Sequence, residues 1–147
     1  MDLQAIKQAA ATYGPAMTKF LREIVAFPGE SAEEKDHVKR IEQEMKDLGF
    51  DEVEVDPMGN ILGYMGTGKT LIAFDGHIDT VPVDEEKWTE KPFGGEVHDG
   101  KLFGRGTTDM KGSVCAMILA GAYLAQDLKK EFAGEIFMAG VVHEECF

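Results

Sequence analysis

Cysteine is scarce in this sequence, with only Cys115 and Cys146 in 147 residues. The two lie far apart and lack the Cys-x-x-Cys spacing, so we expect neither a disulfide framework nor a zinc site made of cysteines alone. Cys115 lies within an apolar run and is predicted to belong to the core.

Long apolar runs and clusters of basic residues are also missing. No stretch approaches the roughly 18 apolar residues of a membrane span, and the N-terminus lacks the basic start and apolar run of a signal peptide. The 15 Lys and Arg residues stand against 27 Asp and Glu, a formal net charge of −12 that repels nucleic acid and anionic membranes. We therefore predict a soluble cytoplasmic protein with neither nucleic acid nor membrane as a partner.

Apolar side chains are abundant enough for one folded domain. They make up 44% of the residues, and the length fits the common domain size of about 100 to 150 residues. Helical periodicity predicts helices over residues 3–26, 31–49 and 110–128. Pro15 is expected to break the first helix, and a capping box of Ser31 and Glu34 to begin the second. Gly49 is expected to end that second helix, with His37 on its polar side.

Period-two patterns and short apolar runs predict the strands. Residues 53–64 are typical of a hairpin, because turn residues 56–60 separate two short strand-like segments. Residues 71–74 and 134–142 are apolar runs that suit buried strands. The long loop 84–106 should hold two small strands near residues 96–97 and 101–103. Strands and helices together indicate an α/β fold.

One motif points to nucleotide binding. Gly63, Gly68, Lys69 and Thr70 satisfy the pattern Gly-x-x-x-x-Gly-Lys-[Ser/Thr]. A phosphate loop needs a helix that begins at the lysine, because the helix N-terminus binds the phosphates. The residues that follow Lys69 are typical of a strand, so we favour a turn here and disfavour P-loop nucleotide binding through residues 63–70.

Metal-ligating side chains follow three of the predicted segments. His77 and Asp79 lie just beyond the strand at 71–74, Asp109 precedes the third helix, and Glu144 and Glu145 follow the strand at 134–142. Asp109 could equally cap the helix, and paired glutamates are common on solvated loops. Taken together, however, His, Asp and Glu are the nitrogen and oxygen ligands that suit zinc and related ions.

Two further histidines are weaker candidates. His98 precedes Asp99 and Gly100, a pair typical of turns, and we expect it to be exposed to solvent. His143 precedes the glutamate pair, and the alternation of a strand should direct it away from Glu144. We therefore expect neither histidine to be a ligand of the site formed by these segments.

The sequence resembles the co-catalytic zinc metallopeptidases that include glutamate carboxypeptidase, acetylornithine deacetylase, succinyl-diaminopimelate desuccinylase and aminoacylase. Four segments in the same order carry the resemblance: residues 76–82, Trp88 with Pro92 and Phe93, residues 104–112, and Glu144 with Glu145. The resemblance implies a three-layer αβα catalytic domain with a mixed sheet, of which residues 1–147 would be the N-terminal portion, without the family's lid domain.

The resemblance also implies a role for each candidate. His77 would bind one zinc, Glu145 the other, and Asp109 would bridge both, with a cis peptide bond after it. Glu144 would be the general base and Asp79 would orient His77. The full-length protein would hold two Zn²⁺ ions, with cobalt or manganese as alternatives. It would hydrolyse a peptide or a small acylated amino acid with a metal-activated water, and it could form a homodimer through the lid.

Two ligands of the family pattern lie beyond the last residue of this sequence. They are an acidic residue or histidine after the glutamate pair and a histidine near the C-terminus. We therefore expect this chain alone to bind zinc weakly or not at all and to be an inactive fragment of a peptidase, deacetylase or desuccinylase. The alternative that we keep open is a non-catalytic α/β binding or assembly module.

Overall fold

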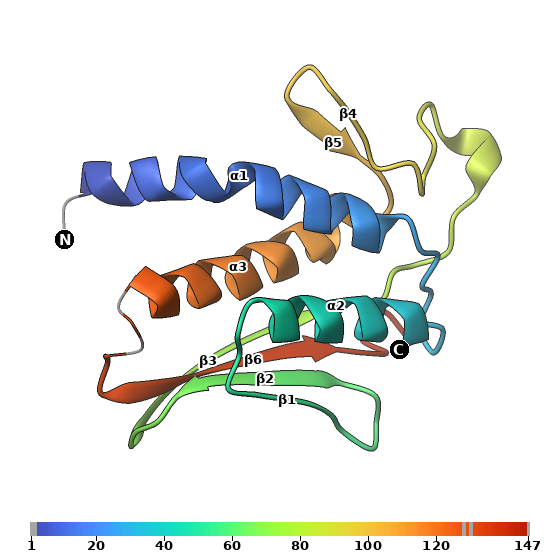
Figure 1. Cartoon of the computed structure of the whole chain (residues 1–147). Coiled ribbons are helices and arrows are strands. Elements are labelled where there is room, and N and C mark those ends of the chain that lie inside the picture. The colour runs from blue at the N-terminus through green and yellow to red at the C-terminus, as the bar shows by residue number, and fades with distance from the viewer. Residues whose placement is uncertain (1–2, 128, 130, 147) are drawn as a thin grey trace.

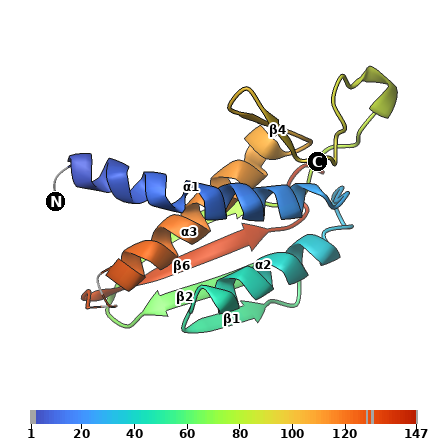
Figure 2. The same cartoon turned by 45° about the horizontal axis from the view of Figure 1, so that its top comes forward.

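The computed structural model describes residues 3–127, 129 and 131–146. They form a four-stranded mixed sheet whose helices all lie on one side of it, and a separate two-stranded hairpin (Figures 1 and 2). The helices are α1 (Leu3–Val25), α2 (Lys35–Asp47) and α3 (Gly112–Asp127), and two short helical turns are η1 (Glu85–Lys87) and η2 (Thr107–Lys111). The strands of the sheet are β1 (Glu52–Val55), β2 (Ile61–Gly66), β3 (Thr70–His77) and β6 (Gly134–Val141). The strands of the hairpin are β4 (Glu96–His98) and β5 (Lys101–Phe103).

The sheet has the strand order β1-β2-β6-β3. β1 and β2 pair as an antiparallel hairpin, β2 pairs antiparallel with β6, and β6 pairs parallel with β3. This confirms the α/β fold and the mixed sheet. The described residues supply two of the three predicted layers, the sheet and the helices on one face. Within this part of the chain, no helix combines the length and hydropathy needed to span a bilayer.

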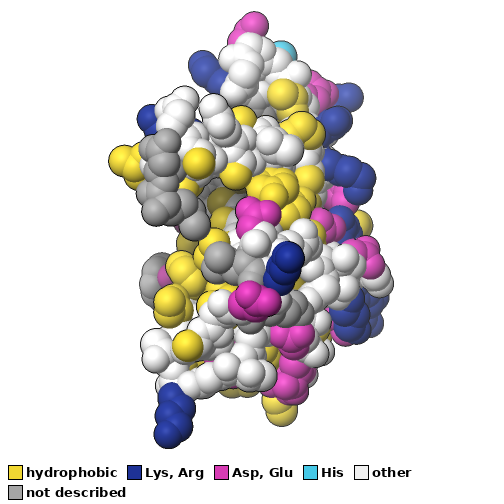
Figure 3. Space-filling view, turned by 60° about the vertical axis from the view of Figure 1, so that its left-hand side comes forward, with side chains coloured by type: hydrophobic (Ala, Val, Ile, Leu, Met, Phe, Trp, Pro, Cys, Tyr) yellow, Lys and Arg dark blue, Asp and Glu magenta, His cyan; other side chains and the backbone are white. Residues whose placement is uncertain are grey.

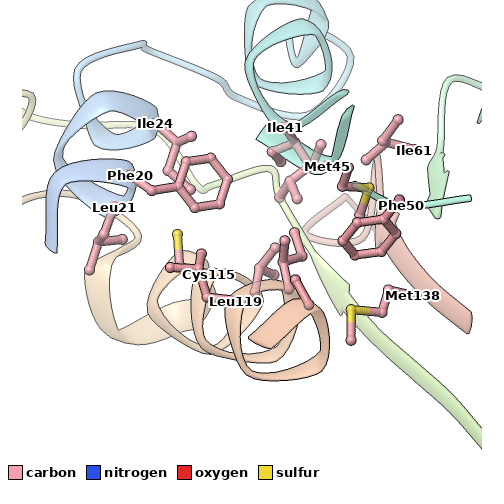
Figure 4. Packing of buried hydrophobic residues seen from close by; sticks show 14 of the residues in the cluster. Phe20, Leu21, Ile24, Ile41, Met45, Phe50, Ile61, Cys115, Leu119 and Met138 are labelled. Carbon is pink, nitrogen blue, oxygen red and sulfur yellow. The ribbon is translucent and has the colours of Figure 1, made fainter. Parts of the chain in front are cut away.

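The core lies between the helices and the inward face of the sheet (Figure 4). Ile24 of α1, Ile41 of α2 and Ile118 of α3 are fully buried there. In β2 every second residue is buried, beginning with Ile61, as the pleat of a strand with one covered face requires. Cys115 is buried in the same cluster, as predicted.

The predicted break at Pro15 was wrong, because α1 continues through this residue from Leu3 to Val25. Proline removes one backbone donor and strains the preceding turn. The residues one turn earlier are exposed, so the carbonyl group that loses its partner can be hydrated. Packing of the second half of α1, where Phe20 and Ile24 are buried, stabilises the continuous helix.

The predicted start of α2 was also wrong in its details. No side-chain cap forms at Glu34, and the hydroxyl of Ser31 bonds elsewhere. His37 is fully buried, not on a polar face. The loop before α2 folds over its ring so closely that a Cβ on Gly29 would lie 2.0 Å from the ring. Burial, aided by the charge of Lys111, lowers the pKa of His37 to about 4. The predicted terminator is confirmed, since Gly49 has a φ of 79° just after the helix.

Strand β3 is present where residues 71–74 predicted it, but its expected burial was wrong. Leu71, Ile72 and Phe74 are 55%, 54% and 43% exposed. Among the described residues β3 is an edge strand, and α3 covers only its end, where a Cβ on Gly76 would lie 3.0 Å from Val114. Figure 3 shows hydrophobic side chains exposed on the side of the molecule at the left of Figure 1.

The nucleotide-binding motif lies in a turn between two strands. β2 ends at Gly66 and β3 begins at Thr70, so no helix begins at Lys69. The backbone of Gly66 has a φ of 83°, a conformation that favours glycine. The motif therefore lacks the helix N-terminus that a phosphate loop requires.

The predicted small strands of the loop 84–106 are confirmed as β4 and β5. The predicted third helix is confirmed as α3, and Leu128 at its expected end lies outside the described residues.

We predict that Ile118→Ala lowers the free energy of unfolding by about 2 to 5 kcal/mol, because the residue is fully buried and its loss leaves a cavity. Leu124→Ala on the same helix is the control. Its side chain is 42% exposed, so the loss should be smaller. Urea unfolding of both variants measures the difference, and equal losses would contradict the position assigned to α3 against the sheet.

Candidate metal centre

Two parallel strands end at the same edge of the sheet and carry the first candidate residues there. His77 is the last residue of β3 and pairs with Val141, the last residue of β6. The backbone N–H of Ile78 then donates to the carbonyl oxygen of Val141 at 2.9 Å, which extends the pairing by one residue. Glu144 and Glu145 lie three and four residues beyond the end of β6. Sites of open α/β sheets gather at this edge, and the sequence prediction placed both segments there.

Asp109 reaches the same edge from the glycine-rich turn before α3. Gly106 begins this turn with a φ of 77°, and the Asp109–Met110 peptide bond is cis, as the resemblance implies. The alternative role as a helix cap is wrong, since the turn has no side-chain cap and α3 begins only at Gly112. Instead, Oδ1 of Asp109 lies 3.0 Å from Nε2 of His77.

The predicted ligands converge on one point. One ligand atom each of His77, Asp109 and Glu145 lies within 4.8 Å of the other two. Oε2 of Glu144 lies 3.9 Å from Nε2 of His77, beside the same point. His77 is buried and its two carboxylate neighbours are more accessible, with the Asp109 side chain 79% exposed. One imidazole nitrogen and two carboxylates facing one point form a donor set that fits a zinc-like divalent ion.

The orientation of His77 depends on Asp79. Nδ1 of His77 lies 3.2 Å from the backbone oxygen of Asp79 and 3.4 Å from its Oδ1. Acceptors around Nδ1 favour a proton on that nitrogen, which leaves Nε2 directed at the carboxylates. Burial alone lowers the pKa of His77. The hydrogen bonds with Asp109 and Asp79 and the charge of Glu144 outweigh that effect and raise the pKa above its ordinary value.

Asp79 is fully buried and connects three segments of the chain. Its Oδ2 accepts a hydrogen bond from the hydroxyl of Ser31 at 2.6 Å and another from the backbone N–H of Glu145 at 2.9 Å. Burial raises the pKa of Asp79, but these donors and the N–H of Glu144 outweigh it and hold the pKa below its usual value. Asp79 therefore positions both His77 and the glutamate pair.

The loop before α2 supplies supporting residues that the sequence prediction missed. Besides Ser31, Glu34 accepts a hydrogen bond at Oε1 from the backbone N–H of His143 at 2.9 Å. The carbonyl oxygen of Gly29 accepts from the backbone N–H of Thr80 at 3.0 Å. The only sequence signal was the pairing of Ser31 with Glu34. That pairing predicts a capping box, because the site that both side chains support forms only in the folded chain.

A buried lysine lies behind the site. Lys111 is 1% exposed, and within the described residues its Nζ has no hydrogen-bond partner. Burial lowers the pKa of Lys111 to about 8, although the negative charge of Asp79 counteracts this effect. The ammonium therefore balances part of the buried charge of Asp79. Sequence reasoning did not identify this role, because a lysine beside glycine carries no signal of burial.

The other two histidines lie outside the cluster. His98 belongs to β4 and is exposed, as predicted. His143 is exposed as well, and its backbone has a φ of 62°. Neither residue belongs to the group formed by His77, Asp109 and Glu145.

We predict that Ser31→Ala lowers the free energy of unfolding by about 1.5 to 3 kcal/mol at neutral pH, since the hydroxyl bonds a buried carboxylate. The folded-state pKa of Asp79 lies below its unfolded value, so this contribution is present above about pH 3.9 and is lost as the pH falls through the folded pKa. Denaturant titrations at several pH values measure it.

The matched control is Ser113→Ala, on an exposed position of α3, with an expected change within about 0.5 kcal/mol. If both serine variants were equally stable at neutral pH, the hydrogen bond to Asp79 would not contribute as described.

The chain is similar to proteins of known family. Residues 73–146 match the model of peptidase family M20/M25/M40. The uncharacterized protein YgeY of Escherichia coli (strain K12) is 45% identical over 146 residues, which cover 99% of this chain and 36% of that protein. Succinyl-diaminopimelate desuccinylase of Cereibacter sphaeroides is 38% identical over 124 residues, which cover 80% of this chain and 32% of that enzyme.

A solved structure agrees with these matches. Human carnosine dipeptidase 1 superposes with a TM-score of 0.84 and 26% identity, over 98% of this chain and 35% of that protein. The chain thus spans about a third of the length of the relatives that it matches. The matched segment contains His77, Asp79, Asp109, Glu144 and Glu145. The chain belongs to peptidase family M20/M25/M40.

Proposed function

We propose that this chain contributes one half of the metal site of an amide-bond hydrolase. The observation that carries the proposal is the convergence of His77, Asp109 and Glu145 at the edge where β3 and β6 end. Membership of the family supports a metal-dependent hydrolase, and the similar proteins named above include a desuccinylase and a dipeptidase. Both of those names describe cleavage of an amide bond.

In this proposal His77 would hold one zinc ion, Glu145 would hold a second, and Asp109 would bridge them. Cobalt or manganese would suit the same nitrogen and oxygen donors. When bound, such a metal pair lowers the pKa of a coordinated water and polarises the carbonyl group of the amide. The described residues provide three ligands, and the resemblance implies two more elsewhere in a longer protein.

The other two residues would act on protons and on orientation. Glu144 is next to the proposed ligand Glu145, and its side chain is 54% exposed, so water and substrate can reach it. It would accept the proton of the attacking water and return it to the leaving nitrogen. Asp79 would hold the proton of His77 on Nδ1, so that Nε2 stays free for the metal.

A hollow beside the ligands is the proposed place for substrate. It has a volume of about 390 Å³, and its lining includes Trp88, Arg105, Asp109 and Glu145. The guanidinium of Arg105 lies 5.0 Å from the centre of the Trp88 ring. A cation beside an aromatic ring suits a peptide or a small acylated amino acid that carries a carboxylate.

The remaining expectations concern the complete protein. We propose that residues 1–147 are the N-terminal portion of the catalytic domain, that the complete protein is cytoplasmic, and that a lid domain mediates a homodimer. Since the chain spans about a third of its relatives, we expect it to show negligible hydrolysis alone.

The first test is a zinc titration of the complete gene product by calorimetry, because the chain alone is expected to bind zinc weakly or not at all. We expect His77→Ala to abolish the zinc-binding event of this site, because it removes the nitrogen ligand. His143→Ala removes an exposed histidine outside the cluster and should leave the event unchanged. Glu144→Gln should also retain zinc. In the complete gene product, Glu144→Gln should abolish amide hydrolysis, since the amide side chain cannot accept the proton.

Two results would contradict the proposal. One is zinc binding by the complete gene product that is identical with and without His77. The other is a complete gene product that binds zinc but hydrolyses no acylated amino acid or peptide, which would favour the non-catalytic α/β module.

The pH dependence of zinc binding is a separate prediction. A metal ion binds only the neutral imidazole, and the pKa of His77 is raised in the metal-free chain. Zinc affinity should therefore fall about tenfold for each pH unit below that raised pKa, because one proton must leave for each ion bound. Titrations from about pH 5.5 to pH 8 cover the range, since ordinary histidines have a pKa of about 6.5. An affinity that stays constant over this range would exclude His77 as the ligand.

A further inference from the structure

A second group of metal-ligating side chains lies on the β4–β5 hairpin and the loop before it. Glu96 and His98 are two residues apart on β4, so their side chains lie on the same face of the strand. Glu90 comes from the preceding loop and joins them from outside the strand. One ligand atom of each residue lies within 4.8 Å of the other two, and Nε2 of His98 is 3.4 Å from Oε1 of Glu90.

The imidazole of His98 is held in a defined orientation. Its ring stacks on Phe103 of β5 with the ring centres 4.3 Å apart and the planes 14° from parallel. Nδ1 lies 3.8 Å from Oδ2 of Asp99, while Nε2 is directed at Glu90. Metal-bound histidines commonly have this arrangement, with one nitrogen on the ion and the other near an outer carboxylate.

The charges around the cluster favour a cation. Glu90 and Glu96 bring two carboxylates to one point, and Asp99 adds a third negative charge beside the ring. Two basic residues lie nearby: Nζ of Lys91 is 4.0 Å from Oε1 of Glu96, with the Lys91 side chain 82% exposed, and the exposed Lys101 pairs opposite His98 in the hairpin. Exposed ion pairs contribute little, so these lysines do not compensate the two carboxylates of the cluster.

We propose that Glu90, Glu96 and His98 form a second binding site for a divalent transition-metal ion. One imidazole nitrogen with two carboxylates suits zinc-like ions and is a poor match for calcium or magnesium, which prefer oxygen ligands alone. The site shares no residue with the cluster of His77, Asp109 and Glu145. The proposal of this second metal site therefore does not depend on the proposed hydrolase function.

An ion at this position would connect the loop that contains Glu90 to strand β4. The hairpin continues after Phe103 into the glycine-rich turn that carries Asp109, which belongs to the first site. The consequence would be a more stable hairpin when the ion is bound, because binding to the folded state alone shifts the unfolding equilibrium.

The test uses the His77→Ala chain, in which zinc binding at the first site has been removed. We expect calorimetry to detect one remaining zinc-binding event and thermal unfolding to shift to higher temperature with zinc. Adding His98→Phe should abolish both effects, because phenylalanine can keep the stacking on Phe103 but has no ligand nitrogen. Adding His143→Ala instead is the matched control and should change neither.

Magnesium in place of zinc should produce neither effect. Circular dichroism verifies that each variant is folded. If the His77→Ala chain binds no zinc, the proposal is overturned. It is equally overturned if His98→Phe leaves the remaining event unchanged. In both cases the effect of His77→Ala on the first site would still test the hydrolase proposal separately.

Discussion

The parallel pairing of β3 with β6 is the constraint on which the site depends. It runs from Thr70 opposite Gly134 to His77 opposite Val141, and it brings together two segments 64 residues apart in the sequence. Because the strands are parallel, their last residues meet at one edge, and the side chains that follow face the same space. The close approach of α3 at Gly76 then places the turn with Asp109 over this edge. Three distant segments thereby reach one point.

Asp79 fixes the positions of the side chains that lie at these strand ends. A buried carboxylate is unfavourable unless hydrogen bonds or nearby charges stabilise it. Here the donors come from Ser31 and from the backbone of Glu145, and the ammonium of Lys111 lies behind. Satisfying one buried charge therefore fixes the loop before α2 and the glutamate pair. The imidazole of His77 is oriented by the same residue.

The exposed edge strand β3 shows why the burial of a strand could not be predicted from its apolar residues alone. An apolar run such as residues 71–74 indicates a strand, but its neighbours decide whether that strand is covered. In the described part of the chain β3 has a partner strand on one side only, and α3 covers only its end. The prediction for His37 was wrong in the opposite direction. Its ring is buried, because the loop just before α2 folds over it.

Local sequence patterns were sufficient to predict the α/β class, most of the helices and strands, and the five candidate residues. Periodicity and turn chemistry depend on neighbours along the chain, and His77, Asp79, Asp109, Glu144 and Glu145 follow predicted strands or turns. The supporting residues Ser31, Glu34 and Lys111 could not be assigned from the sequence. Their roles arise from contacts between segments far apart in the chain, and only the packing of the loop before α2 against the strand ends creates those contacts. The sequence by itself determined which side chains could bind a metal, and the tertiary structure decided which of them meet, because distance in space is set by strand pairing.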